Sequence, residues 1–208
     1  AHSVGAILVV DATQSMGMVP IDAVASGADV IISSGYKWLR GTYGTAVGYL
    51  SPEAKKLVPG IVGFRSNEDI WDMRSDRMNL PKDASRFEFT TLHFGALRGL
   101  AASIEEMLEI GIERIWEHDL SLSDMVVELA SSRGLEVTSP TDDDQRSAIV
   151  SIRPPSEHHS AEIVRRLQDE FGILVTDRSG MIRVSPHIDN DHSQIEFLFT
   201  SLDKILAN

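Results

Sequence analysis

Two short apolar runs, each leading into a polar residue, constrain the fold of this chain more than any other feature. The first run, residues 6–11, ends in the carboxylate of Asp11, and the second, residues 29–33, lies just before Lys37. Short apolar runs separated by turns or helices are typical of largely buried strands in an α/β sheet. Because two strand ends can meet at one edge of a sheet, we expect an acid and an amine to lie together there.

An acid and a lysine at one sheet edge suit the chemistry of pyridoxal 5'-phosphate. The lysine forms a Schiff base with the cofactor, and the carboxylate keeps the pyridinium nitrogen protonated. Taken alone, an aspartate after a strand is more typical of a turn cap. A lone lysine is more typical of the surface, but the apolar neighbours Tyr36, Trp38 and Leu39 argue against that reading here.

Five motifs, in order along nearly the whole chain, resemble the C-terminal portion of the class V aminotransferase family of fold type I pyridoxal-phosphate enzymes. That family includes cysteine desulfurases, kynureninases and proteins like isopenicillin N epimerase. One motif alone would be a weak signal, whereas the ordered set is a strong one. The motifs are Asp11-Ala12-Thr13-Gln14-Ser15, Ser34-Gly35-Tyr36-Lys37-Trp38-Leu39, Gly41-Thr42-Tyr43-Gly44, Arg86-Phe87-Glu88-Phe89-Thr90-Thr91 and Ile182-Arg183-Val184-Ser185-Pro186-His187.

The resemblance implies roles for the residues of the first two motifs. Lys37 would form the Schiff base and move protons at the substrate's α-carbon, and Asp11 would pair with the ring nitrogen. Gln14 resembles the glutamine that contacts the cofactor's phenolic oxygen, and Ser34 and Tyr36 would bind the phosphate. From the residues alone, an exposed turn amide and a loop hydroxyl remain alternatives for Gln14 and Ser34.

The resemblance also assigns one residue in each of the last two motifs. Thr91 matches a threonine that reaches the cofactor phosphate of the neighbouring subunit, which implies a homodimer; its alternative is a cap on the helix beginning near His93. Arg183 matches an arginine that binds the substrate carboxylate, and a planar guanidinium suits that task. The alternative for Arg183 is a surface ion pair at a strand edge.

Composition excludes several classes of partner. The 208 residues include 31 acids and 19 bases, for a formal charge of −12, which disfavours nucleic acid and anionic membranes. No apolar run approaches the roughly 20 residues of a membrane span. The chain has no cysteine, which fits a cytoplasmic protein and argues against a persulfide-forming desulfurase, because that reaction needs a cysteine nucleophile.

The pattern of elements predicts an α/β fold in three parts. Residues 1–92 are expected to be the end of a large cofactor-binding domain, 93–134 connecting helices, and 135–208 a small C-terminal α/β domain. Because the chain opens almost directly into an apolar run, we expect upstream sequence with the family's phosphate-binding turn and stacking aromatic residue. The expected strands are 6–11, 29–33, 45–50, 135–138, 148–152, 173–176 and Met181–Val184.

Helix signals are clearest in the second half. A three- and four-residue apolar period begins at His93, is interrupted by Gly111 and resumes until Gly134. Further helices are expected over 157–171 and from Asp191, a capping residue, to Leu206. A short helical turn is expected within 20–27, a helix start at 51–53 with a serine cap, and a long loop over 59–81.

These observations favour a pyridoxal-phosphate enzyme acting on an amino acid or related amine, with aminotransferase, epimerase and lyase reactions all open. The alternative is a non-catalytic fragment or degenerate homologue that acts as a dimerisation or interaction module. A nicotinamide oxidoreductase is disfavoured because no glycine-rich dinucleotide turn is present. The stretch 187–192 is rich in His and Asp, but it lacks a standard metal-ligand spacing, so we expect no metal site.

Overall fold

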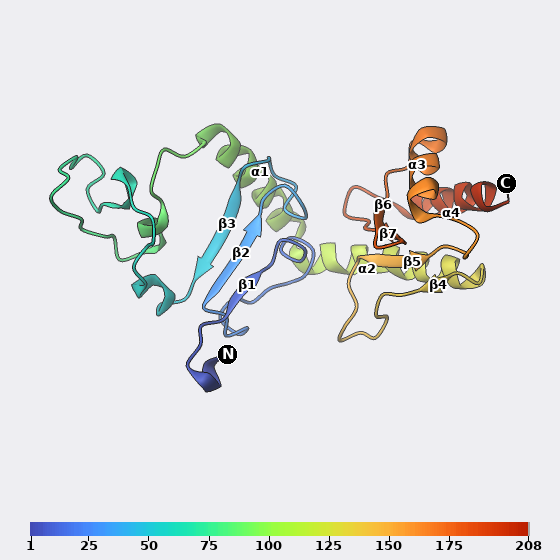
Figure 1. The fold of residues 1–208 in the computed structure, drawn as a ribbon, viewed down its shortest axis with the longest axis horizontal. Helices are drawn as coiled ribbons and strands as arrows, with labels where there is room; N and C mark the ends of the chain where they lie inside the picture. Colours follow the sequence, from blue (N-terminus) through green and yellow to red (C-terminus); the bar gives the residue numbers. More distant parts are fainter. Residues whose placement is uncertain (208) are drawn as a thin grey trace. The chain divides into compact units, whose positions relative to one another are not determined.

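The chain folds into two compact units, seen in a computed structural model that describes residues 1–207. The first unit is Ala1–Glu109 and the second begins at Ile110 (Figure 1). Each unit contains its own β-sheet together with helices, so the predicted α/β class is confirmed. The predicted assignment of 1–92, 93–134 and 135–208 to the family's domains stays a prediction.

The first unit is built on a three-stranded sheet of order β1-β2-β3 (Figure 1). Its strands are β1 (Val9–Asp11), β2 (Val30–Ser34) and β3 (Ala46–Leu50). β1 runs parallel to β2, with Asp11 opposite Ile32, and β3 runs antiparallel to β2, with Ala46 opposite Ser34. The carboxyl ends of β1 and β2 therefore lie at the same edge of the sheet.

The two faces of this sheet differ in burial. Ile31 and Ser33 on one face are almost fully buried, and Ile31 packs with Ala12 and Ala28 in a small apolar cluster. On the other face Val9 and Ile32 are 55% and 46% exposed. The prediction of largely buried strands is therefore wrong for this face of the first sheet.

Irregular chain and short 3-10 helices fill much of the remainder of the first unit. They are η1 (His2–Val4), η2 (Ala54–Lys56), η3 (Phe64–Ser66) and η4 (Ala84–Phe87). The helix start predicted at 51–53 is confirmed only as a single turn, η2, where Ser51 Oγ accepts from the Ala54 N–H at 3.1 Å. The helical turn predicted within 20–27 is a series of hydrogen-bonded turns at 23–27.

Two long helices follow, α1 (Phe94–Ile110) and α2 (Ile112–Ser132). Gly111 separates them and has a φ of 95°, a backbone conformation that residues other than glycine rarely adopt. The interruption predicted at Gly111 is thus confirmed. His93 caps the start of α1, since its Nδ1 accepts from the Ala96 N–H at 3.1 Å.

The second unit contains a four-stranded antiparallel sheet of order β4-β5-β7-β6. Its strands are β4 (Glu136–Val137), β5 (Val150–Arg153), β6 (Thr176–Arg178) and β7 (Met181–Val184), and its later helices are α3 (Ser160–Phe171) and α4 (His192–Leu206). One sheet face joins the helices in a single apolar core. Fully buried members of that core include Leu122, Val126, Ile152, Ile163, Leu167, Ile182, Phe199 and Ile205.

The predicted elements of this unit are largely confirmed, with one shift. Asp191 caps α4, and its carboxylate accepts from the Gln194 N–H at 3.0 Å. The strand predicted at 173–176 begins only at Thr176, where the pairing with Arg183 starts; Ile173 and Val175 precede the strand and pack against the core. Within residues 1–207, no helix is both long and apolar enough to cross a membrane.

Candidate active site

Asp11 and Lys37 follow neighbouring parallel strands, and a threonine ties the two chain segments together. The Asp11 carboxylate accepts from the Thr13 N–H at 3.0 Å. Thr13 Oγ1 in turn accepts from the N–H of Ser34 at 3.1 Å. The segment after β1 is therefore hydrogen-bonded to the end of β2, three residues before Lys37.

The electrostatics of this edge keep Asp11 ionised. Hydrogen bonds from Thr13 lower the pKa of Asp11 below its ordinary value of 3.8; desolvation opposes them, and the positive charge of Lys37 adds the smallest lowering effect. The Asp11 side chain is solvent-exposed. The site thus offers a carboxylate anion that lies within the electrostatic influence of the Lys37 amine.

The backbone around Lys37 forms a tight closed loop. The Gly35 N–H donates to the Thr45 carbonyl, and the Gly41 N–H donates to the Gly35 carbonyl, both at 2.8 Å. Across the tip, the Arg40 N–H donates to the Lys37 carbonyl at 2.8 Å, and Arg40 adopts a φ of 54°. These bonds close the loop at its base and at its tip, so the position of Lys37 along the chain is well defined.

Two glycines allow this loop to pack against its surroundings. A Cβ at Gly35 would lie 2.4 Å from Thr45 Oγ1, and a Cβ at Gly17 would lie 2.4 Å from the Trp38 carbonyl oxygen. Real Cβ contacts do not reach such distances. The segment after Asp11 and the loop of Lys37 therefore touch through backbone at Gly17 and Trp38.

Helix α1 anchors the far side of the same loop. Ser103 Oγ donates to the Leu39 carbonyl at 2.8 Å, and the Arg40 guanidinium pairs with Glu106 at 3.0 Å. Thr42 Oγ1 donates to the carbonyl of Ala96 at 2.9 Å. Side chains and backbone of α1 thus hold the C-terminal part of the loop, from Leu39 to Thr42.

A pair of stacked tyrosine rings lies beside the lysine. The rings of Tyr36 and Tyr43 stack at a centroid distance of 4.7 Å and an interplanar angle of 19°. Lys37 Nζ lies 5.8 Å from the centroid of the Tyr36 ring, within the range of a cation–π interaction. Ser34, at the end of β2, is half-buried at the same edge.

Gln14 lies next to this loop with its amide already engaged. Its Oε1 accepts from the Trp38 indole N–H at 3.4 Å, a long hydrogen bond. This contact leaves the amide nitrogen of Gln14 as a donor toward solvent. Trp38 itself is buried, so the bond fixes Gln14 against the residue that follows Lys37.

Thr91 and Arg183 lie away from this edge in the chain. Thr91 is exposed and precedes α1, whose cap is His93, so the alternative of a Thr91 cap is wrong. Arg183 belongs to β7 of the second unit, and its Nε atom is buried without a hydrogen-bond partner. Burial, followed by the charge of Arg178, lowers the pKa of Arg183.

Thr13 and Trp38 make contacts at the site that the sequence did not predict. Thr13 joins Asp11 to Ser34, and Trp38 binds Gln14 and packs against Gly17. The Asp-x-Thr spacing was an available signal for the first of these, because aspartate side chains often accept from the N–H two residues later.

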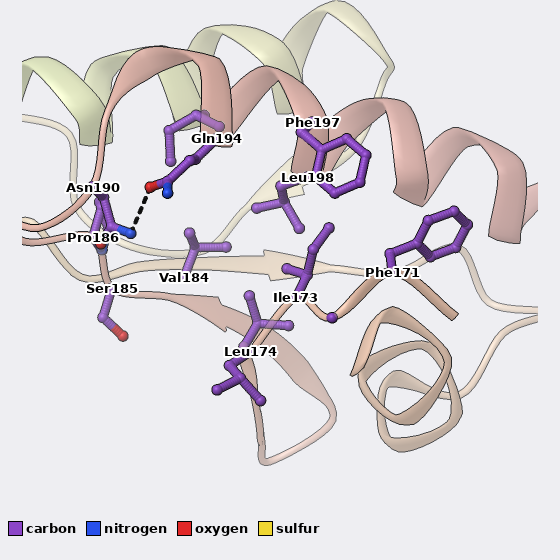
Figure 2. Close-up of a pocket in the computed structure, with 13 residues that line it drawn as sticks. Phe171, Ile173, Leu174, Val184, Ser185, Pro186, Asn190, Gln194, Phe197 and Leu198 are labelled. Atoms are coloured by element: carbon purple, nitrogen blue, oxygen red, sulfur yellow. Dashed lines mark hydrogen bonds between the residues drawn. The ribbon is translucent and has the colours of Figure 1, made fainter. Parts of the chain in front are cut away.

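The second unit contains a separate apolar groove of about 320 Å³ (Figure 2). Its apolar wall is formed by Phe171, Leu174 and Phe197. At its polar end, Asn190 Nδ2 donates to Gln194 Oε1 at 2.9 Å. Among the described residues, those predicted for the active site do not line it. No group of three or more potential metal ligands is found within residues 1–207 either.

This mixed α/β chain, with an aspartate and a lysine at one sheet edge, has the fold of the fold type I pyridoxal-phosphate enzymes. The apo structure of cysteine desulfurase from Thermococcus onnurineus NA1 matches it with a TM-score of 0.88 and 26% sequence identity, over 100% of this chain and 54% of that chain. The sequence pattern described as Aminotransferase class-V matches residues 1–202, and the chain belongs to this family. The predicted family resemblance is thereby confirmed.

Two curated relatives illustrate the range of the family. A probable cysteine desulfurase of Methanothermobacter thermautotrophicus is 30% identical over 99% of this chain and 54% of the relative. A kynureninase of Geobacillus thermodenitrificans is 28% identical over 89% of this chain and 44% of the relative. The chain thus spans about half the length of the curated relatives it matches.

Proposed function

We propose that this chain is the lysine-bearing part of a pyridoxal-phosphate-dependent enzyme that acts on an amino acid or related amine. One observation carries the proposal: Asp11 and Lys37 lie at one sheet edge, are linked through Thr13 and Ser34, and interact by charge. Family membership supports it, since the matched pattern covers residues 1–202.

The chemistry of the side chains at this edge fits pyridoxal phosphate. The ionised carboxylate of Asp11 suits a protonated ring nitrogen, and the Lys37 amine suits an aldehyde. The hydroxyls of Ser34 and Tyr36 are suitable donors to a phosphate, and the amide nitrogen of Gln14 is a suitable donor to a phenolic oxygen. We assign these five residues to the cofactor.

When bound, pyridoxal phosphate captures amines through its aldehyde and withdraws electrons from the bonds of the substrate's α-carbon. Asp11 would contribute a fixed negative charge that holds the proton on the ring nitrogen. Lys37 would hold the cofactor and then give or take a proton at the α-carbon, as a general acid and base. The closed loop between Gly35 and Gly41 would keep its amine within reach.

Two residues outside this edge complete the proposal. Arg183 would bind the substrate carboxylate, because a guanidinium presents two parallel donors to it and the Nε of Arg183 is a buried donor without a partner. Thr91 would reach the cofactor phosphate of a second copy of the chain, so we propose a homodimer, located in the cytoplasm. We also propose the domain division of the Sequence analysis, with residues 1–92 in the cofactor domain, 93–134 as connecting helices and 135–208 in the C-terminal domain.

The proposed reaction is a transamination, an epimerisation or a lyase reaction, and not persulfide-forming desulfuration. Curated relatives include both cysteine desulfurases and a kynureninase, so the relatives alone do not choose between these reactions. A persulfide needs a thiol nucleophile, and this chain has no cysteine. We therefore place the reaction among those that need only the lysine and the carboxylate.

A second candidate is an interaction module without turnover. The half-exposed apolar residues Val9 and Ile32, on one face of the first sheet, favour it. Exposed apolar surface of this kind is typical of a face that another chain or segment covers. In this alternative Lys37 would be an ordinary surface amine.

Borohydride trapping separates the two candidates. The chain is incubated with pyridoxal phosphate, reduced, digested and mapped for the mass adduct, and the adduct is expected on Lys37. Lys37→Arg should abolish it, whereas Lys56→Arg should leave it unchanged, because Lys56 is an exposed lysine paired with Glu53. An adduct on another lysine, or none, would refute the assignment of Lys37 and favour the interaction module.

A further inference from the structure

The open face of the second sheet brings two arginines together. Alternate side chains of a strand point to opposite faces, and Thr176 lies directly opposite Arg183 in the pairing of β6 with β7. Arg178, two residues after Thr176, therefore shares the face of Arg183. Ile182 and its strand neighbours on the other face are buried in the core.

Hydroxyl groups accompany this arginine pair. Ser151 of β5 lies opposite Arg183 on the side away from β6, so the face presents Ser151 and Thr176 on either side of that guanidinium. Asp177, the acid between Thr176 and Arg178, points to the other face, where its carboxylate accepts from Ser160 Oγ at 2.5 Å. The local acid is thus directed away from the arginines.

The two guanidinium groups are not neutralised by the protein. Among residues 1–207, no carboxylate pairs with Arg178 or Arg183, although the chain has a formal charge of −12. A third arginine on the same face, Arg153, is satisfied by Glu136 at 2.7 Å. Arg153 has an acid directly opposite it in the sheet, whereas the residues opposite Arg178 and Arg183 are Met181, Thr176 and Ser151.

The pairing is also energetically unfavourable without an anion. The Nε of Arg183 is buried and has no hydrogen-bond partner, and a buried unsatisfied donor costs free energy. Burial and the like charge of Arg178 both lower the pKa of Arg183, which means that both disfavour its charged form. An anion between the two side chains would relieve both effects.

We propose that Arg178 is a second anion-binding residue beside Arg183, and that the substrate is an amino acid with a second acidic group. This inference rests on the proposed function, in which Arg183 binds the α-carboxylate. Arg178 binds the second carboxylate or an equivalent acidic group of the side chain. The hydroxyls of Ser151 and Thr176, on either side of Arg183, donate to the acidic groups of the substrate. Substrates with a neutral side chain leave Arg178 unpaired.

A matched pair of ligands tests the proposal directly. Succinate and butyrate have the same number of carbons and differ by one carboxylate, and their binding to the full chain is measured by calorimetry at low ionic strength. Succinate should bind about tenfold more tightly, as expected for one added charge-assisted contact. Arg178→Gln should remove this preference while leaving butyrate binding within about twofold, and Arg183→Lys should weaken both ligands.

Arg153→Gln is the matched control, because Arg153 lies on the same face but is already paired with Glu136. If Arg153→Gln and Arg178→Gln reduce the succinate preference equally, the proposal is overturned, because the preference would then come only from the overall positive charge of this sheet face. A lack of succinate preference, or no binding of either ligand, would overturn it as well. Arg178 would then be only a charged residue that keeps the edge strand β6 from pairing with another chain.

The proposed function and this inference fail separately. If the borohydride adduct forms on Lys37 but Arg178→Gln leaves succinate binding unchanged, only the inference is wrong. If no adduct forms on Lys37 but the succinate preference depends on Arg178, the anion site stands and the proposed cofactor chemistry is wrong.

Discussion

Replacement of Gly17 by alanine should destabilise the first unit strongly, although the substitution adds only one methyl group. Gly17 adopts φ of +100°, and a Cβ there would lie 2.4 Å from the Trp38 carbonyl oxygen and 2.7 Å from its carbonyl carbon. Both contacts are with backbone, so no side-chain rotation can relieve them. The loop of Lys37 or the segment after Asp11 must move.

The magnitude follows from two separate effects. Placing a non-glycine residue in the left-handed region costs roughly 1–2 kcal/mol. Inserting a methyl group into a well-packed site costs about 1–3 kcal/mol more. Since whole domains are stable by only about 5–15 kcal/mol, the loss is a large fraction of the stability of this unit. At roughly 4–8 °C per kcal/mol, Tm should fall by about 10 °C or more.

Gly27→Ala is the control, because Gly27 has φ of +66° but nothing lies within 4 Å of the position that an added methyl group would take. It should show the conformational cost alone. Thermal unfolding is followed by calorimetry, so that transitions of the two units can be separated. If both variants lower Tm equally, the contact with Trp38 has no energetic weight and the two segments are not held together as we describe.

Three further substitutions test other parts of the molecule. Asp11→Asn should leave the cofactor bound but lower kcat by about 10²–10³, because a neutral amide cannot hold the proton on the ring nitrogen. Arg183→Lys should weaken an amino-acid substrate selectively over its decarboxylated amine, because a point charge replaces a two-donor fork. Asp191→Ala removes the cap that binds the Gln194 N–H and should cost about 1 kcal/mol of stability, measured by denaturant unfolding. Because its folded-state pKa is lowered, Asp11 should be half-protonated only below pH 3.8, which an NMR titration can follow. The stability it contributes should be lost as pH falls from that ordinary value through the lowered one.

Each of these expectations has a contrary result. Turnover of Asp11→Asn within a few fold of the parent would exclude a role for Asp11 in keeping the ring nitrogen protonated. Similar losses for acid and amine substrates would mean that Arg183 does not bind the carboxylate. For the cap, Thr200→Ala on the exposed face of α4 is the control, and an equal loss of stability there would exclude a specific effect of Asp191. Half-protonation of Asp11 at or above pH 3.8 would contradict the lowered pKa.

Local signals predicted the helices well because their causes are local. Gly111 interrupts an apolar period and adopts the positive φ that only glycine readily accepts, so the break between α1 and α2 was predictable. Asp191 stands immediately before an apolar period and caps α4 through an N–H three residues later. In both cases the residue and its partner are close in sequence.

The site was predictable in its principal members but not in its supporting contacts. Asp11 and Lys37 could be placed at one edge because each follows a short apolar run. The bond from Ser34 to Thr13 spans 21 residues and exists only because β1 pairs in parallel with β2 in one particular register. Side-chain periodicity does not specify that register, so the contribution of Thr13 required the structure.

The strand register of the second sheet explains why the arginine pair could not be predicted. The apolar run 173–176 predicts a strand, but Ser179 and Gly180, both with positive φ, form the hairpin turn and so align Thr176–Arg178 with β7. A shift of one residue would move Arg178 to the buried face and separate it from Arg183. The turn therefore decides which charges meet, whereas the apolar pattern of 173–176 places the strand too early in the chain. The anion site that we infer depends on two residues at a hairpin tip rather than on the arginines alone.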